Sequence, residues 1–175
     1  GIRVPFFLRF PAMFSGNQEV NQFTAHIDLL PTLSKLCNVE MPRDRKIDGR
    51  SFIPSINSQK LPERSFFSYW TRKYPELYNN IALQRGQFKL IGKTDYNSPI
   101  ENFELYDTYN DPSEKNNLVT QKKSIALSLK KEMHQTFLEL VNSENLKNPP
   151  RIMLGSDFEN PVYLNRNDAG GQRAV

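Results

Sequence analysis

The sequence has 175 residues, enough for one domain or pieces of two, and its 23 basic and 19 acidic side chains give a formal net charge of +4. The basic residues are spread along the chain rather than gathered in one stripe, so we expect no nucleic-acid partner. The single cysteine, Cys37, excludes an internal disulfide framework and a cysteine-rich zinc site, and no apolar run is long enough for a bilayer, so we expect no membrane partner.

The first predicted element is a strand over residues 4–10. This run is almost entirely apolar and carries prolines at Pro5 and Pro11, a pattern typical of a strand that is buried on both faces. Such a strand needs parallel neighbours, and nothing before Gly1 supplies one. We therefore expect the chain to begin inside a domain, with the missing N-terminal part of the same polypeptide as its partner.

A helix is predicted over residues 28–37. Asp28 suits the N-cap, Pro31 is tolerated in the first turn, and the leucines that follow form one apolar stripe. Cys37 lies on that stripe, so we expect a buried hydrophobic residue rather than a reactive thiol.

Beyond this helix the composition changes to that of a proline-containing linker and then a second domain. We expect residues 1–62 to be the edge of one domain with its linker, 63–148 a subdomain, and 149–175 an extended tail. Strands are predicted at 64–70, 81–84, 88–91 and 103–106, a helical turn at 111–114 and a long helix at 121–141. Short extended pieces are predicted at 151–156 and 161–164.

Five short motifs then occur in a characteristic order. They are Gly1-Ile2-Arg3-Val4-Pro5; Ile27-Asp28-Leu29-Leu30-Pro31-Thr32-Leu33; Asp48-Gly49-Arg50-Ser51; Glu104-Leu105-Tyr106-Asp107; and Asn110-Asp111-Pro112-Ser113-Glu114 with Asn117-Leu118. The sequence resembles the C-terminal part of an arylsulfatase-type sulfatase of the alkaline phosphatase superfamily. The fold implied is an α/β fragment: the last strand and helix of an alkaline-phosphatase-like domain, followed by an α+β subdomain with about four antiparallel strands packed on one long C-terminal helix.

The resemblance also implies sulfate-ester hydrolysis of sulfated carbohydrates or aryl sulfates. In the family, the nucleophile is a formylglycine made from Cys or Ser in a Cys/Ser-x-Pro-x-Arg motif, beside a calcium ion. This chain does not contain that motif, so the resemblance implies that the catalytic centre lies upstream. No catalytic or metal-binding residue is assigned here, and we expect the isolated chain to be inactive. A periplasmic or secreted location is implied by the resemblance alone.

Two other functions stay open at this point. One is a fragment of a sister phosphodiesterase or phosphonate hydrolase, which shares the strand and helix but differs in nucleophile and metals. The other is a non-catalytic module that binds an acidic glycan. The nucleophile motif upstream of Gly1 distinguishes the first from a sulfatase, and titration with sulfated and desulfated oligosaccharides tests the second.

Candidate substrate-binding residues lie in two loops. Sulfated sugars are bound by cations at the sulfate groups and by aromatic faces at the rings, and Trp70, Arg72 and Lys73, with Tyr74 and Tyr78, offer both. A second candidate is Arg166, in the polar segment at 165–168. The alternatives are a core position for Trp70, solvated charges at the basic residues, and a tight turn at 165–168.

Overall fold

The computed structural model describes residues 4–71, 75–93, 98–142, 152–154 and 162–164. The chain divides into two compact units, Gly1–Glu63 and Arg64–Val175, and each is described by itself. In the described part of the chain, no helix combines the length and the apolar character needed to span a membrane.

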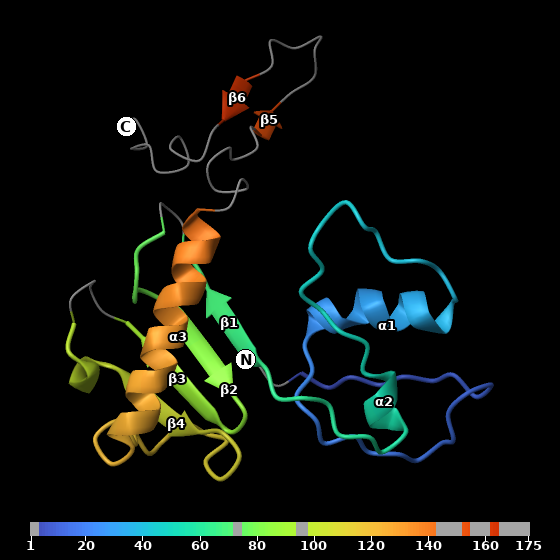
Figure 1. The fold of residues 1–175 in the computed structure, drawn as a ribbon, viewed down its shortest axis with the longest axis horizontal. Helices are drawn as coiled ribbons and strands as arrows, with labels where there is room; N and C mark the ends of the chain where they lie inside the picture. The colour runs from blue at the N-terminus through green and yellow to red at the C-terminus, as the bar shows by residue number, and fades with distance from the viewer. Residues whose placement is uncertain (1–3, 72–74, 94–97, 143–151, 155–161, 165–175) are drawn as a thin grey trace. The chain divides into compact units, whose positions relative to one another are not determined.

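Unit 1 contains three short helices joined by irregular segments (Figure 1). They are η1 (His26–Asp28), α1 (Leu29–Leu36) and α2 (Ile53–Ile56). The predicted helix is therefore confirmed, and Asp28 does occupy the N-cap of α1. Its carboxylate does not cap that helix. It accepts a hydrogen bond from the Ala25 backbone N–H instead, at 2.9 Å.

A buried polar contact joins two of the family motifs of unit 1, those at 27–33 and 48–51. Asp28, which is fully buried, also accepts the backbone N–H of Arg50 at 2.9 Å. The Thr32 hydroxyl donates to the Asp28 carbonyl at 2.6 Å and accepts the Phe52 N–H at 3.1 Å. Gly49 makes this approach possible, because a Cβ there would lie only 1.9 Å from the Ile27 carbonyl oxygen.

The prediction of a strand over residues 4–10 is wrong for this structure. These residues have no strand conformation, and their apolar side chains are exposed, from 38% at Leu8 to 91% at Phe7. The physical reason is that a strand exists only with a neighbour that accepts and donates its backbone hydrogen bonds. No strand pairs with this segment in the part of the chain that the structure describes.

The apolar stripe of α1 is also more exposed than predicted. Leu30 and Leu33 are 53% and 49% exposed, and Cys37 is exposed, so the prediction of a buried thiol is wrong. The side chains that α1 and its N-cap do bury are Thr32 and Asp28, which are polar. Helical periodicity locates a stripe, but only a covering element buries it.

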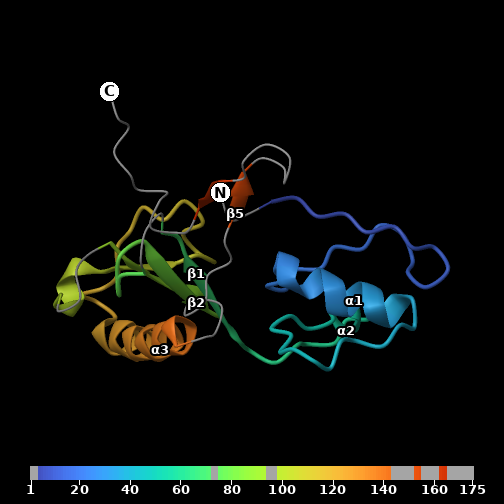
Figure 2. The same ribbon diagram turned by 90° about the horizontal axis from the view of Figure 1, so that it is seen from above.

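Unit 2 is a four-stranded antiparallel sheet covered on one face by a long helix (Figures 1 and 2). The strands lie in the order β1-β2-β3-β4, which confirms the predicted sheet of about four antiparallel strands packed on one long helix. Gly86 lies between β2 and β3 at a φ of 55°, which suits the tight hairpin. The elements are β1 (Ser65–Tyr69), β2 (Ile81–Arg85), β3 (Phe88–Gly92), η2 (Ile100–Asn102), β4 (Glu104–Asp107) and α3 (Lys123–Val141).

The core of unit 2 lies between the sheet and α3. Leu83 pairs with Leu90, and Leu90 with Leu105, so the three leucines form a row across the strands. All are at most 1% exposed, as are Leu129 and Met133 on the facing side of α3. Alternation along each strand directs these side chains to the helix-covered face.

The motif after β4 is structural. The Asp107 carboxylate accepts the backbone N–H groups of Tyr109 and Asn110, and the Asn117 amide oxygen accepts that of Leu105 at 3.0 Å. The helical turn predicted at 111–114 is a hydrogen-bonded turn instead, which ends at Glu114 with a φ of 52°. These bonds fold the segment back along β4.

Two further strands, β5 (Ile152–Leu154) and β6 (Val162–Leu164), pair antiparallel in a separate sheet. They fall inside the extended pieces predicted for the tail.

Candidate functional site

A shallow pocket among the described residues lies on α3, beside the loop that precedes β2. The pocket has a volume of about 390 Å³ and is open to solvent. Its lining combines basic, aromatic and amide side chains and contains no acidic residue. The six residues are Tyr78, Leu127, Lys130, Lys131, His134 and Gln135. Five of them lie on α3, between positions 127 and 135.

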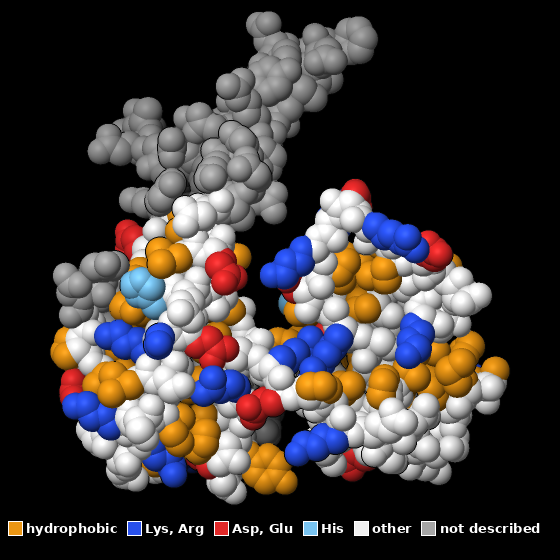
Figure 3. All heavy atoms as spheres, in the orientation of Figure 1, with side chains coloured by type: hydrophobic (Ala, Val, Ile, Leu, Met, Phe, Trp, Pro, Cys, Tyr) orange, Lys and Arg blue, Asp and Glu red, His pale blue; other side chains and the backbone are white. Residues whose placement is uncertain are grey.

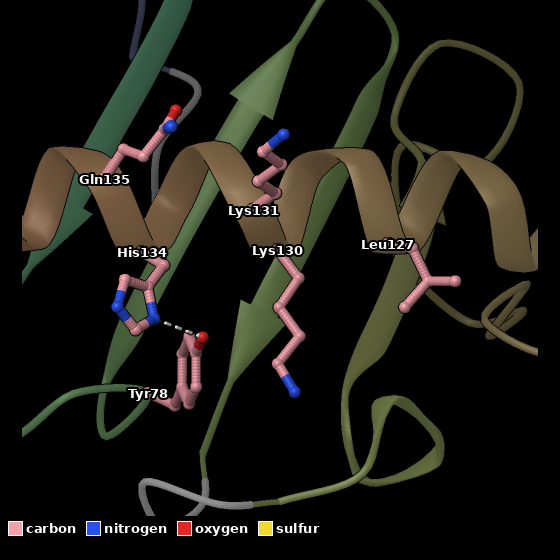
Figure 4. Close-up of a pocket in the computed structure, with 6 residues that line it drawn as sticks. All are labelled: Tyr78, Leu127, Lys130, Lys131, His134 and Gln135. Atoms are coloured by element: carbon pink, nitrogen blue, oxygen red, sulfur yellow. Dashed lines mark hydrogen bonds between the residues drawn. The ribbon is translucent and has the colours of Figure 1, made fainter.

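Tyr78 and His134 form the polar centre of this pocket. The Tyr78 hydroxyl lies 2.9 Å from His134 Nδ1, at hydrogen-bond distance, and the Tyr78 ring packs edge-on against Phe103 with 5.1 Å between centroids. Figure 4 shows Lys130 reaching from α3 on the same side as His134 and Tyr78, whereas Lys131 and Gln135 extend the other way.

Lys130 is the most constrained cation of the pocket. Its Nζ donates to the Ser98 carbonyl oxygen at 2.6 Å and lies 4.9 Å from the Tyr78 ring centroid and 4.7 Å from that of Phe103. Burial lowers the pKa of the Lys130 ammonium from its ordinary value, and the Glu101 carboxylate partly opposes that shift. The aromatic faces and the carbonyl therefore stabilise a partly desolvated charge.

The predicted substrate-binding residues are only partly described. Trp70 follows β1 and is 59% exposed, so it is not a core aromatic. Arg72, Lys73 and Arg166 lie outside the described residues, and their roles stay predictions. Tyr78 was predicted to present an aromatic face beside Trp70, but it is 5% exposed and its ring belongs to the core.

Sequence reasoning missed His134 and Lys130 as pocket residues. A signal was available, since basic residues at 130, 131 and 134 fall on one helical face. The other half of the pocket could not be predicted from that pattern, because Tyr78 lies 56 residues from His134. Elsewhere on the α3 side of unit 2, acidic and basic side chains are interleaved (Figure 3).

The described residues do not fit the calcium ion that sulfatases use. Nowhere in these ranges do three or more His, Cys, Asp or Glu side chains gather closely enough to hold a metal ion. Hard cations such as calcium require several oxygen ligands, so no catalytic step is derived through a metal here.

The comparison with known families agrees with the motifs and the fold. Residues 1–143 match the family described as N-sulphoglucosamine sulphohydrolase, C-terminal. This chain belongs to that sulfatase C-terminal family. The predicted resemblance to the C-terminal part of a sulfatase is thereby confirmed, and the relatives of this chain are sulfuric ester hydrolases.

Individual relatives cover parts of this sulfatase C-terminal chain. The human steryl-sulfatase is 38% identical over 71 residues, which are 39% of this chain and 12% of that protein. The ulvan-active sulfatase of Formosa agariphila is 28% identical over an alignment of 166 residues; the match covers 76% of this chain and 32% of the relative. The chain therefore spans about a third or less of the length of these two relatives.

Solved structures include a complex with a sulfated carbohydrate. A protein bound to its substrate, D-glucosamine-2-N,6-O-disulfate, is 24% identical to this chain, with a TM-score of 0.42. The match covers 70% of this chain and 25% of that one.

Proposed function

We propose that this chain is the C-terminal part of a sulfatase that hydrolyses sulfate esters of a sulfated carbohydrate. The observation that carries the proposal is the family match over residues 1–143. The carbohydrate substrate is favoured over a steryl or aryl sulfate because the match to the ulvan-active sulfatase extends over 76% of the chain, against 39% for steryl-sulfatase. In this proposal the formylglycine nucleophile and the calcium ion belong to residues upstream of Gly1.

The sheet-and-helix unit supplies a scaffold for substrate contacts in this proposal. Trp70 follows directly after the end of β1, and its side chain is 59% exposed; in this proposal its ring stacks on a sugar. Arg72 and Lys73 follow within three residues and would pair with sulfate groups. Arg166 is a further candidate for the same role. Loop residues positioned by a rigid sheet are common in binding sites.

Sulfate release by the full-length protein tests the activity. Ulvan oligosaccharides and 4-nitrophenyl sulfate are supplied in parallel, and free sulfate is measured by ion chromatography. We expect the full-length protein to release sulfate from the oligosaccharides, and residues 1–175 alone to release none. Hydrolysis of a phosphodiester without sulfate release would assign the protein to the sister enzymes and overturn the proposal. Recovery of the protein from the periplasmic or culture fraction tests its proposed export.

Two exposed aromatic residues give a matched test of substrate contact. Trp70→Ala removes the proposed stacking face, and Tyr109→Ala removes a ring that is 78% exposed on another loop. We expect the KM for the oligosaccharide to rise about fivefold in the first variant, which corresponds to about 1 kcal/mol, and to be unchanged in the second. Equal effects would exclude a specific role for Trp70.

A further inference from the structure

The size and the side chains of the pocket on α3 indicate a binding site. Its volume of about 390 Å³ falls within the range of small-molecule sites. Lys130 and His134 offer a cationic and a donor group on the side of α3 where Tyr78 lies, and Lys131 lines the pocket but extends the other way. None of the six lining residues is acidic. The arrangement suits an anion, because no carboxylate of the lining competes for these donors.

Lys130 is positioned to meet such an anion. The Ser98 carbonyl oxygen accepts one of the three N–H donors of the ammonium, at 2.6 Å, and the ammonium nitrogen lies over the rings of Tyr78 and Phe103. The charge is partly removed from water without a carboxylate at ion-pair distance among the described residues. An oxyanion of a ligand at this point would accept a charge-assisted hydrogen bond from the Lys130 ammonium and so offset part of the free-energy cost of its desolvation.

The backbone of Tyr78 is strained at the same place. Its φ is 64°, in the left-handed region that bulky residues rarely adopt. Gly92 permits the conformation, since a Cβ at Gly92 would lie 2.6 Å from the Tyr78 carbonyl oxygen. Strain of this kind persists where the surroundings fix it, and it concentrates at functional sites. The side chain of the same residue places its hydroxyl 2.9 Å from His134 Nδ1.

We infer that this pocket binds the sulfate or carboxylate group of an acidic saccharide, with Lys130 as the main cation, His134 beside it and Lys131 as a more distant cation. The saccharide as the source of the anion rests on the proposed function, whereas the anion site rests on the geometry alone. Binding is weak for a single free anion, because the pocket is open to water.

Titration of residues 1–175 with sodium sulfate tests the anion site. Side-chain NMR signals of Lys130, His134 and Tyr78 are followed at constant ionic strength, with sodium chloride as the reference salt. We expect saturable shifts of these signals with sulfate and none with chloride. Shifts that never saturate, or that map to other residues, would overturn the site.

Dextran sulfate and unsulfated dextran then identify the source of the anion. Competition between dextran sulfate and free sulfate for the same signals supports an acidic saccharide. Binding of free sulfate without any effect of dextran sulfate overturns the saccharide. Because no hydrolysis is measured, these results are independent of sulfatase activity, and an active sulfatase without sulfate-dependent shifts overturns only the pocket.

Lysine variants separate this site from general charge attraction. We expect Lys130→Gln to weaken dextran sulfate binding about fivefold, Lys131→Gln about twofold, and Lys130→Arg much less than Lys130→Gln. Lys115→Gln removes the same charge from an exposed position outside the pocket and serves as the control. The amide spectrum of β2 and β3 verifies folding, and Lys131→Gln retains the test if Lys130→Gln unfolds. Equal weakening by Lys115→Gln and Lys131→Gln would overturn the proposal.

Discussion

The two units bury different kinds of side chain. The buried hydrophobic cluster belongs entirely to unit 2, where the sheet and α3 enclose residues such as Leu105 and Met133. Unit 1 buries Asp28, Thr32 and Ser55, with Phe52 and Ile53 as its buried hydrophobic residues. Unit 2 is therefore stabilised mainly by apolar burial, and unit 1 by directional hydrogen bonds between two motifs. Both units carry recognisable motifs in the sequence, but the motifs do not reveal whether a unit is stabilised by apolar burial or by hydrogen bonds.

The largest expected effect is on the core of unit 2. Leu105→Ala removes a side chain that is 0% exposed and creates a cavity in the leucine row, so the free energy of unfolding should fall by about 2–5 kcal/mol. Leu33→Ala in unit 1 removes a leucine that is 49% exposed and should cost well under about 1 kcal/mol. Denaturant unfolding followed by circular dichroism measures both variants. Equal losses would contradict the comparison.

The next effect concerns the close contact inside unit 1. Gly49→Ala places a Cβ 1.9 Å from the Ile27 carbonyl oxygen, so the backbone must move away and the bonds to Asp28 weaken. We expect a loss of about 1–3 kcal/mol, seen as faster amide hydrogen exchange at Arg50 and Phe52. Gly16→Ala is the control, since nothing lies within 4 Å of a Cβ there. Unchanged exchange in Gly49→Ala would show that the two motifs are not held together as described.

A smaller effect should appear at acid pH in unit 2. Hydrogen bonds from the Asn110 side chain and then from backbone N–H groups lower the pKa of the Asp107 carboxyl below its ordinary value, despite an opposing effect of burial. The folded-state pKa is thus below the unfolded one, so this contribution is present above the unfolded pKa and is lost as the pH falls through the folded pKa.

Asp107→Asn tests this contribution. At neutral pH the variant should be less stable than the wild type by about 1 kcal/mol, and the difference should shrink as the pH falls below about 4. Unfolding curves between pH 7 and pH 2.5 give the measurement. A stability difference that does not depend on pH would show that the carboxylate charge has no part in it.

The smallest expected effect is at Cys37. Because its side chain is exposed in unit 1, Cys37→Ser should change the free energy of unfolding by less than about 0.5 kcal/mol. In the wild type, a thiol reagent such as DTNB should react without denaturant. Protection of the thiol until unfolding would mean that the stripe of α1 is covered.

The sequence predicts unit 2 well because its patterns are local. Strand alternation and turn residues located all four strands, and the helix predicted at 121–141 is observed at Lys123–Val141. The range does not show which apolar side chains of this helix are buried: Ala126 is fully buried, whereas Leu140 is 40% exposed. The direction in which α3 faces the sheet decides this, and that is a tertiary property.

The other features that were predicted wrongly or not at all depend on contacts with residues distant in the sequence, which no local pattern specifies. Residues 4–10 have the composition of a strand, but a strand also needs a pairing partner. The conformation of Tyr78 depends on Gly92, which lies on β3, and so the pocket could not be inferred from either segment alone. The basic spacing on α3 was visible in the sequence, but its aromatic counterpart was not.

The Asp28 carboxylate also divides unit 1 into positions that are held in place and a segment between them that is not. It fixes two points 22 residues apart, Asp28 and Arg50, while the exposed stretch at 42–46 between them pairs its charges locally, as in Arg45 with Asp44 at 2.6 Å. Closing a longer loop costs little extra entropy, since each doubling of length adds only about 0.6 kcal/mol. Insertions and charge reversals at 42–46 should therefore be tolerated without loss of the contact between Asp28 and Arg50.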